Sequence, residues 1–152
     1  MTPEFPEFPE LSSFGTLFRF ASLLEEAAAG MADHLAARKR CADARDAIAD
    51  CGRRHRKRGG ELERLKRERL NEVVLEPVSG MDRGAYVPVL EVAPDAGCAQ
   101  CLEALAAVED LAVRFYDDAA RVAAGAMPGM DRILQRLARE NREIAASLRA
   151  KA

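Results

Sequence analysis

Residues 98–123, CAQCLEALAAVEDLAVRFYDDAARVA, decide the fold, because their apolar side chains recur at the spacing of one helical face. Alanine dominates this segment, and alanine, leucine, arginine and glutamate dominate most of the chain, which favours helix over strand. A carboxylate, Glu109, interrupts the apolar face. The face consists of Leu102, Leu105, Glu109, Ala112, Tyr116, Ala119 and Ala123.

Three further helices are predicted on the same grounds. The first spans about residues 13–37, with Ser12 or Ser13 as its N-cap. The second spans about residues 41–70, where Gly59-Gly60 should weaken or bend it. The last follows a turn at residues 125–129 and ends near Ala150. The sequence therefore predicts an all-α domain.

The segment between the second and third helices, about residues 71–97, is a long connection. Pro77, Pro88 and Pro94 interrupt helix there. A connection of 27 residues is unusual unless it travels the length of the structure. We expect a four-helix bundle at residues 13–150, made of two antiparallel hairpins joined by this crossover and preceded by an arm at residues 1–12.

Composition bounds the function. A chain of 152 residues suits one domain, and its 49% hydrophobic content argues against disorder. No apolar run approaches a membrane span, and an acidic N-terminus is unlike a signal peptide, so we expect a cytoplasmic protein without membrane contact. The segment from Arg38 to Arg69 contains 13 Lys and Arg residues but no aromatic residue that could stack on bases. We expect these basic residues to face solvent or another subunit, and we do not expect nucleic-acid binding.

Polar residues replace apolar ones on each predicted helix. Glu25 lies between Ala21 and Ala28, as Glu109 lies between Leu105 and Ala112. A buried carboxylate without a partner costs several kcal/mol and calls for a cation, a proton or a metal. The other helices contribute His55, Glu140 and Glu143.

The spacing of these residues suggests one shared level. Glu25 and His55 are 30 residues apart, and Glu109 and Glu140 are 31 apart, with a turn about halfway in the second hairpin. Residues 24–32 also parallel residues 108–116, which suggests an internal repeat of two hairpins.

With these residues the sequence, over about 13–148, resembles the ferritin-like superfamily and its rubrerythrin-type branch. That resemblance implies a di-iron site with one Glu from each of two helices and a Glu-x-x-His pair from each of the others. Val108-Glu109 through Tyr116 is the best-kept piece. Gly52 stands where a ligand Glu is expected, Ala32 where a second Tyr is expected, and Glu143 where a second His is expected.

The resemblance implies a metal-binding protein, with iron, or else manganese or zinc, in iron or peroxide chemistry as an oxidoreductase. Its expected ligands are Glu25, His55, Glu109, Glu140 and Glu143. Tyr116 would hydrogen-bond a ligand or carry an electron as the catalytic residue. We also expect a homodimer.

Other interpretations stay open. Glu25 and Glu109 could lie at the edge of solvent-facing helix surfaces, and Glu26 could replace Glu25. His55 could belong to a solvent-facing basic surface, because it lies in a basic run at residues 53–58. A member that has lost its metal would be a helical interaction or dimerisation module with an apolar surface at Phe5, Phe8 and the connection.

The four cysteines, in a chain without an export signal, are expected to be reduced thiols or metal ligands. Cys98 and Cys101 open the third helix and could form a thiol sensor. Cys41 would lie near them if the crossover returns to the start of the second helix, giving a zinc site or a switchable disulfide. Cys51 falls on the core stripe.

Overall fold

The computed structural model describes residues 7–152, which form four α-helices and two short 3-10 helices. The elements are α1 (Phe14–Ala36), η1 (Lys39–Ala44), α2 (Arg45–Arg69), η2 (Arg83–Ala85), α3 (Cys98–Ala123) and α4 (Met130–Ala150). The prediction of an all-α, four-helix protein is confirmed. Within the described residues, no helix is both long and apolar enough to cross a membrane.

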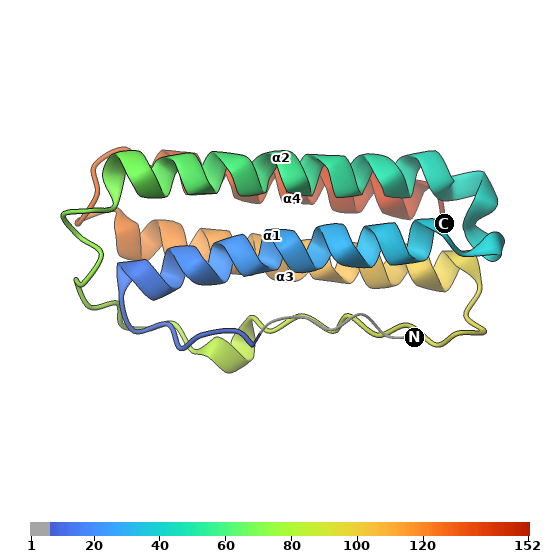
Figure 1. The fold of residues 1–152 in the computed structure, drawn as a ribbon, viewed down its shortest axis with the longest axis horizontal. Coiled ribbons are helices and arrows are strands. Elements are labelled where there is room, and N and C mark those ends of the chain that lie inside the picture. The colour runs from blue at the N-terminus through green and yellow to red at the C-terminus, as the bar shows by residue number, and fades with distance from the viewer. Residues whose placement is uncertain (1–6) are drawn as a thin grey trace.

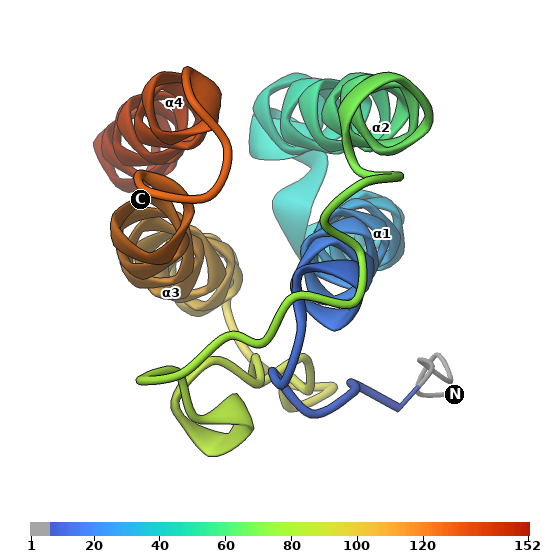
Figure 2. The same cartoon turned by 90° about the vertical axis from the view of Figure 1, so that its left-hand side faces the viewer.

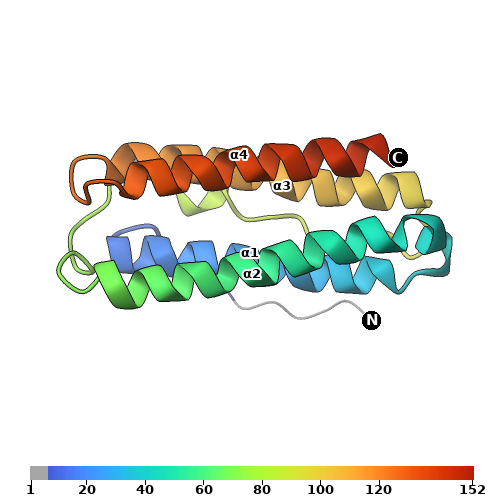
Figure 3. The same ribbon diagram turned by 90° about the horizontal axis from the view of Figure 1, so that it is seen from above.

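The helices pair as two antiparallel hairpins. Figure 1 shows α1 and α2 packed together, and α3 and α4 packed together, with the connection running the length of the molecule between α2 and α3. The two hairpins lie side by side when seen from above (Figure 3). In the end view, α2 neighbours α4, α1 neighbours α3, and the connection passes beneath α1 and α3 (Figure 2). All four helices therefore face a common interior.

Local chemistry explains where the helices begin. Ser13 caps α1, since its hydroxyl accepts from the backbone N–H of Thr16, whose own hydroxyl accepts from Ser13 N–H. The N–H of Gly97 donates to Gln100 Oε1 at 3.0 Å at the start of α3. Gly129, with φ of 86°, makes the left-handed turn that precedes α4.

The second helix differs from the prediction at its start. It begins at Arg45 and not at residue 41, because Cys41 has a non-helical backbone (φ −102°, ψ 17°) within η1. The expected weak point at Gly59-Gly60 does not break α2, which continues to Arg69.

The described part of the arm, residues 7–12, packs on the bundle through Phe8 and Leu11. Phe8 is buried, with its ring centroid 4.7 Å from that of Phe20. Phe5 lies outside the described residues. Among residues 7–152, the exposed large hydrophobic side chains all lie on the connection, and they are those of Val74, Leu75, Val87 and Val89.

A disulfide joins Cys41 in η1 to Cys98 at the start of α3. The conditional prediction that Cys41 approaches Cys98 is therefore confirmed. The expectation that all four cysteines are thiols or metal ligands is wrong, because the crossover returns the chain to η1 and brings these two Cα atoms within 5.0 Å. Cys51 and Cys101 are free and buried.

Two apolar clusters fill the interior, one toward each end of the bundle. Between them lies a buried polar group to which all four helices contribute. We call it the central polar layer, and its members are Glu25 from α1, His55 and Arg58 from α2, Glu109 from α3 and Asn141 from α4.

Candidate metal centre

His55 bridges the two glutamates of the central polar layer. Its Nδ1 lies 2.5 Å from Glu25 Oε2, and its Nε2 is hydrogen-bonded to Glu109 Oε1. Carboxylates only accept hydrogen bonds, so an imidazolium with both nitrogens protonated satisfies both contacts. Burial alone lowers the pKa of His55, but the charges of Glu25 and Glu109 raise it well above its ordinary 6.5.

Arg58 supplies a second buried cation. Its guanidinium, 3% exposed, donates to Asn141 Oδ1 at 2.7 Å and lies 3.4 Å from Glu25 Oε1. It also donates to Glu140 Oε2 at 2.8 Å. Among the described residues, its Nε is a buried side-chain nitrogen with no hydrogen-bond partner. Three acceptors therefore fix this cation beside Glu25.

Glu25 is held from several sides. Tyr116, from α3, donates its hydroxyl to Glu25 Oε1 at 2.5 Å. Burial raises the pKa of Glu25, but the opposite effect of His55 and Arg58 is larger. The pKa of Glu25 therefore lies below its ordinary 4.5. The pKa of Tyr116 is raised well above 10.0 by burial and by the Glu25 charge. We therefore treat Glu25 as ionised and Tyr116 as neutral.

Glu109 is the matching carboxylate of the second hairpin. Asn141 Nδ2 donates to Glu109 Oε2 at 2.5 Å, and Cys51 Sγ lies 3.6 Å from Glu109 Oε1. Burial raises the pKa of the Cys51 thiol, which favours its protonated form. With His55 and Arg58 positive and both glutamates negative, the central polar layer is electrically balanced.

Three buried donors in this region lie close enough to share one ion. Ligand atoms of Cys51, His55 and Glu109 are all within 4.8 Å of one another. Cys51 and His55 project from the same face of α2 because they are four residues apart, or about one helical turn. A thiol, an imidazole and a carboxylate form a donor set typical of transition-metal sites.

The structure brings together some of the residues predicted from sequence and not others. Glu25, His55, Glu109 and Tyr116 meet, as expected. Glu140 lies half-buried at the edge, where it binds Arg58 and Arg136. Glu143, expected as a ligand, is exposed, because Asn141 takes the inward position on α4.

The structure also places Glu26, the alternative to Glu25, and Gly52, which stands where the family pattern has a ligand Glu. Glu26 is exposed, so it does not replace Glu25. A side chain at Gly52 would meet Ala32 Cβ at 3.4 Å and Asp33 Oδ1 at 3.3 Å. Position 52 therefore faces α1 and not the central polar layer, and the absence of a side chain allows α1 and α2 to approach there.

Sequence reasoning missed Cys51 as a donor, and Arg58 and Asn141 altogether. Arg58 follows His55 by three residues and so shares its helical face. That spacing could have identified it, but the surrounding basic run at residues 53–58 is typical of a solvated surface.

A cavity of about 460 Å³ opens on the α1–α2 face. Ala29, Gly30 and Gly59, which have a methyl side chain or none, line part of it, and Glu25 and His55 line it as well. The cavity therefore borders the Glu25–His55 pair, of which each residue is 2% exposed.

Fold and site together define a helical-bundle protein with a buried, charge-balanced centre and a candidate metal-ligand triad. Comparisons with known protein families, with curated proteins and with solved structures find no match for the chain.

Proposed function

We propose that this is a ferritin-like, metal-binding protein whose centre holds one divalent ion through Cys51, His55 Nε2 and Glu109. The observation that carries the proposal is the convergence of these three buried donors, from α2 and α3, within 4.8 Å. The proposed ligand set retains His55 and Glu109 of the sequence prediction, adds Cys51, and moves Glu25 to a supporting role.

The residues around the triad support this assignment. Metal-binding histidines commonly donate their second ring N–H to a carboxylate, and Glu25 accepts from His55 Nδ1 at 2.5 Å. Asn141 fixes Glu109 in the same way. Tyr116 acts through Glu25, which it holds by a hydrogen bond, and so we assign it a positioning role.

Arg58 argues for one ion and against two. Its guanidinium already neutralises Glu25 and Glu140, the carboxylates that a second ion would need. Gly52 offers no ligand. Relative to a two-metal ferritin-like site, the charge of Arg58 would take the place of the second ion.

Charge balance is preserved when the ion enters. A divalent cation would replace one proton of His55 and the thiol proton of Cys51, so the total charge of the buried region stays unchanged. A thiolate, imidazole and carboxylate set suits zinc or iron better than manganese. Three protein ligands leave a coordination position open, and iron there would supply oxygen or peroxide chemistry.

Metal analysis of protein purified without chelator, and after reconstitution with Zn²⁺ or Fe²⁺, tests the proposal. We expect about one ion per chain, as one triad can hold one ion. Cys51→Ala and Glu109→Gln should each lose it. Glu143→Gln is the matched control, because Glu143 is exposed, and should keep it.

Two ions per chain, or full loading of Glu109→Gln, would contradict the assignment. Circular dichroism of each variant separates loss of the ion from loss of the fold. Sedimentation of the same samples checks the predicted homodimer.

A second candidate is a metal-free helical module that serves for interaction or dimerisation. The observation that favours it is the pairing of Glu25 and Glu109 with His55 and Arg58, which balances the charge without an ion. This candidate would be supported over the first if the protein, after reconstitution, holds less than about a tenth of an ion per chain and its folding and stability are the same as before.

A further inference from the structure

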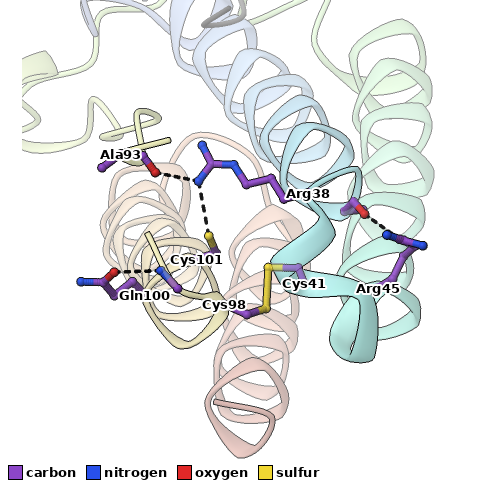
Figure 4. Close-up of a disulfide and its surroundings, with 9 residues drawn as sticks. Arg38, Cys41, Arg45, Ala93, Cys98, Gln100 and Cys101 are labelled. Carbon is purple, nitrogen blue, oxygen red and sulfur yellow. Dashed lines mark hydrogen bonds between the residues drawn. A yellow bond between two sulfur atoms is a disulfide. The ribbon is translucent and has the colours of Figure 1, made fainter. Parts of the chain in front are cut away.

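The second chemical feature of the molecule is a group of three cysteines where η1 meets the start of α3 (Figure 4). The disulfide between Cys41 and Cys98 joins residues 57 positions apart, and so links one hairpin covalently to the other. Cys101 follows Cys98 by one turn of α3 and is free. This group takes no part in the central polar layer.

The two cysteines of α3 differ in exposure. Cys98 is half-buried and lines a cavity of about 240 Å³ together with Arg40, Asp43 and Lys151. Cys101 is fully buried. A half-buried cysteine followed three residues later by a fully buried one is typical of a Cys-x-x-Cys exchange pair, in which the second sulfur attacks a disulfide formed by the first.

A cation faces the buried sulfur. Arg38 Nη1 lies 3.6 Å from Cys101 Sγ and donates to the carbonyl of Ala93 at 2.8 Å (Figure 4). Nη2 of the same guanidinium donates to the carbonyl of Val92 at 2.8 Å. Arg40 binds the carbonyl of Asp95. The disulfide and these two arginines together tie the end of the connection to η1.

We propose that Cys41, Cys98 and Cys101 form a thiol–disulfide exchange site. The Cys101 thiol loses its proton and attacks Cys98 Sγ, which forms a Cys98–Cys101 disulfide and breaks the Cys41–Cys98 bond. Cys41 leaves as a thiolate and takes up the proton. One disulfide forms and one breaks, so the step needs no external oxidant or reductant.

The exchange would change what holds the two hairpins together. The covalent link between η1 and α3 is replaced by a local link within α3, and Cys41 becomes a free thiol. Arg38, which contacts both Cys101 and the connection, would couple the state of the cysteines to the position of residues 92 and 93.

Disulfide mapping of the full chain tests the exchange. The protein is equilibrated in glutathione redox buffers, quenched with acid, alkylated and digested with trypsin. Cys41 falls in the fragment 41–45, whereas Cys98 and Cys101 share the fragment 84–114. The Cys41–Cys98 bond thus joins two fragments, and the Cys98–Cys101 bond leaves one fragment lacking two hydrogens, beside an alkylated Cys41.

We expect both disulfides in the wild type, in a ratio that stays the same across the buffers, because the exchange consumes neither oxidant nor reductant. Cys101→Ala should show only the Cys41–Cys98 form. Ala99→Ser, at an exposed position between the two cysteines of α3, should behave like the wild type. A wild type that passes directly from the Cys41–Cys98 disulfide to three thiols would overturn the proposal.

Cys41→Ala keeps the test decisive if another variant folds poorly. Upon oxidation, this variant should form the Cys98–Cys101 disulfide within one chain. Persistence of two thiols at Cys98 and Cys101 would show that the pair cannot close. Neither result depends on whether the central polar layer binds metal.

Discussion

Helices α2 and α4 occupy equivalent places in the two hairpins, yet they contribute very different chemistry to the interior. From α2 come Cys51, His55 and Arg58 on successive turns, whereas the fully buried polar residue of α4 is Asn141. The carboxylates, in contrast, are symmetric, with Glu25 on α1 and Glu109 on α3.

This difference shows that the hairpins depend on each other electrostatically. Glu109 has no buried cation on its own hairpin and receives its positive partner, His55, from α2. A buried carboxylate without a partner would cost several kcal/mol. The second hairpin therefore buries Glu109 at low cost only when the first is in place.

Removal of the buried guanidinium of Arg58 from α2 should cause the largest loss of stability. We expect Arg58→Met to lower the free energy of unfolding by about 3–5 kcal/mol, because Glu25 loses a buried partner and Asn141 an internal donor. Urea denaturation of metal-free protein measures the change.

The control is Arg136→Met. Arg136 also binds Glu140, at 2.8 Å, but its side chain is 43% exposed, and exposed ion pairs contribute about 0–1 kcal/mol. Equal losses for the two variants would contradict the view that burial of Arg58 is what matters.

A change on α4 should have an intermediate effect. Asn141→Ala removes one donor to Glu109 and one acceptor from Arg58, and we expect a loss of about 1–3 kcal/mol, as for buried groups left without partners. Replacement of its exposed neighbour in Arg142→Ala should cost less than about 1 kcal/mol. If Asn141→Ala matches Arg58→Met, the asymmetry between α2 and α4 is energetically unimportant.

The smallest expected effect is the pH dependence contributed by His55 in metal-free protein. Its pKa is raised on folding, so its stabilising contribution is complete below its ordinary 6.5 and is lost as the pH rises through the folded value. For Glu25, whose pKa is lowered, the contribution is complete above 4.5 and is lost as the pH falls through the folded value.

Chemical denaturation across the pH range should therefore give the greatest stability between about pH 4.5 and 6.5. Outside this range, the free energy of unfolding should fall by up to about 1.4 kcal/mol per pH unit for each proton taken up or released on unfolding. His55→Gln removes the titrating group and should flatten the alkaline slope. An alkaline slope that persists in this variant would assign it to another residue.

The sequence predicted the four helices well because their apolar periodicity is long and regular, and because prolines confine the break to one connection. Glu25 and Glu109 could be found because each interrupts an otherwise apolar face. These are local signals, and they need no knowledge of how the helices pack.

The remainder of the site depends on packing that periodicity does not determine. Glu140, Asn141 and Glu143 differ by about 100° of rotation per residue around α4, so a small change in the preceding turn decides which one faces inward. Arg58 is one of several consecutive basic residues. The Cys41–Cys98 bond needs the path of the whole connection.

The lengthwise path of the connection also shapes how the chain can fold. Each hairpin is built from neighbouring segments and can collapse quickly, but their union must wait for closure of a long loop, which is entropically costly. The charged side chains of the central polar layer lose their water when the two hairpins dock. We therefore expect the rate-limiting barrier to folding to lie at the meeting of two preformed halves.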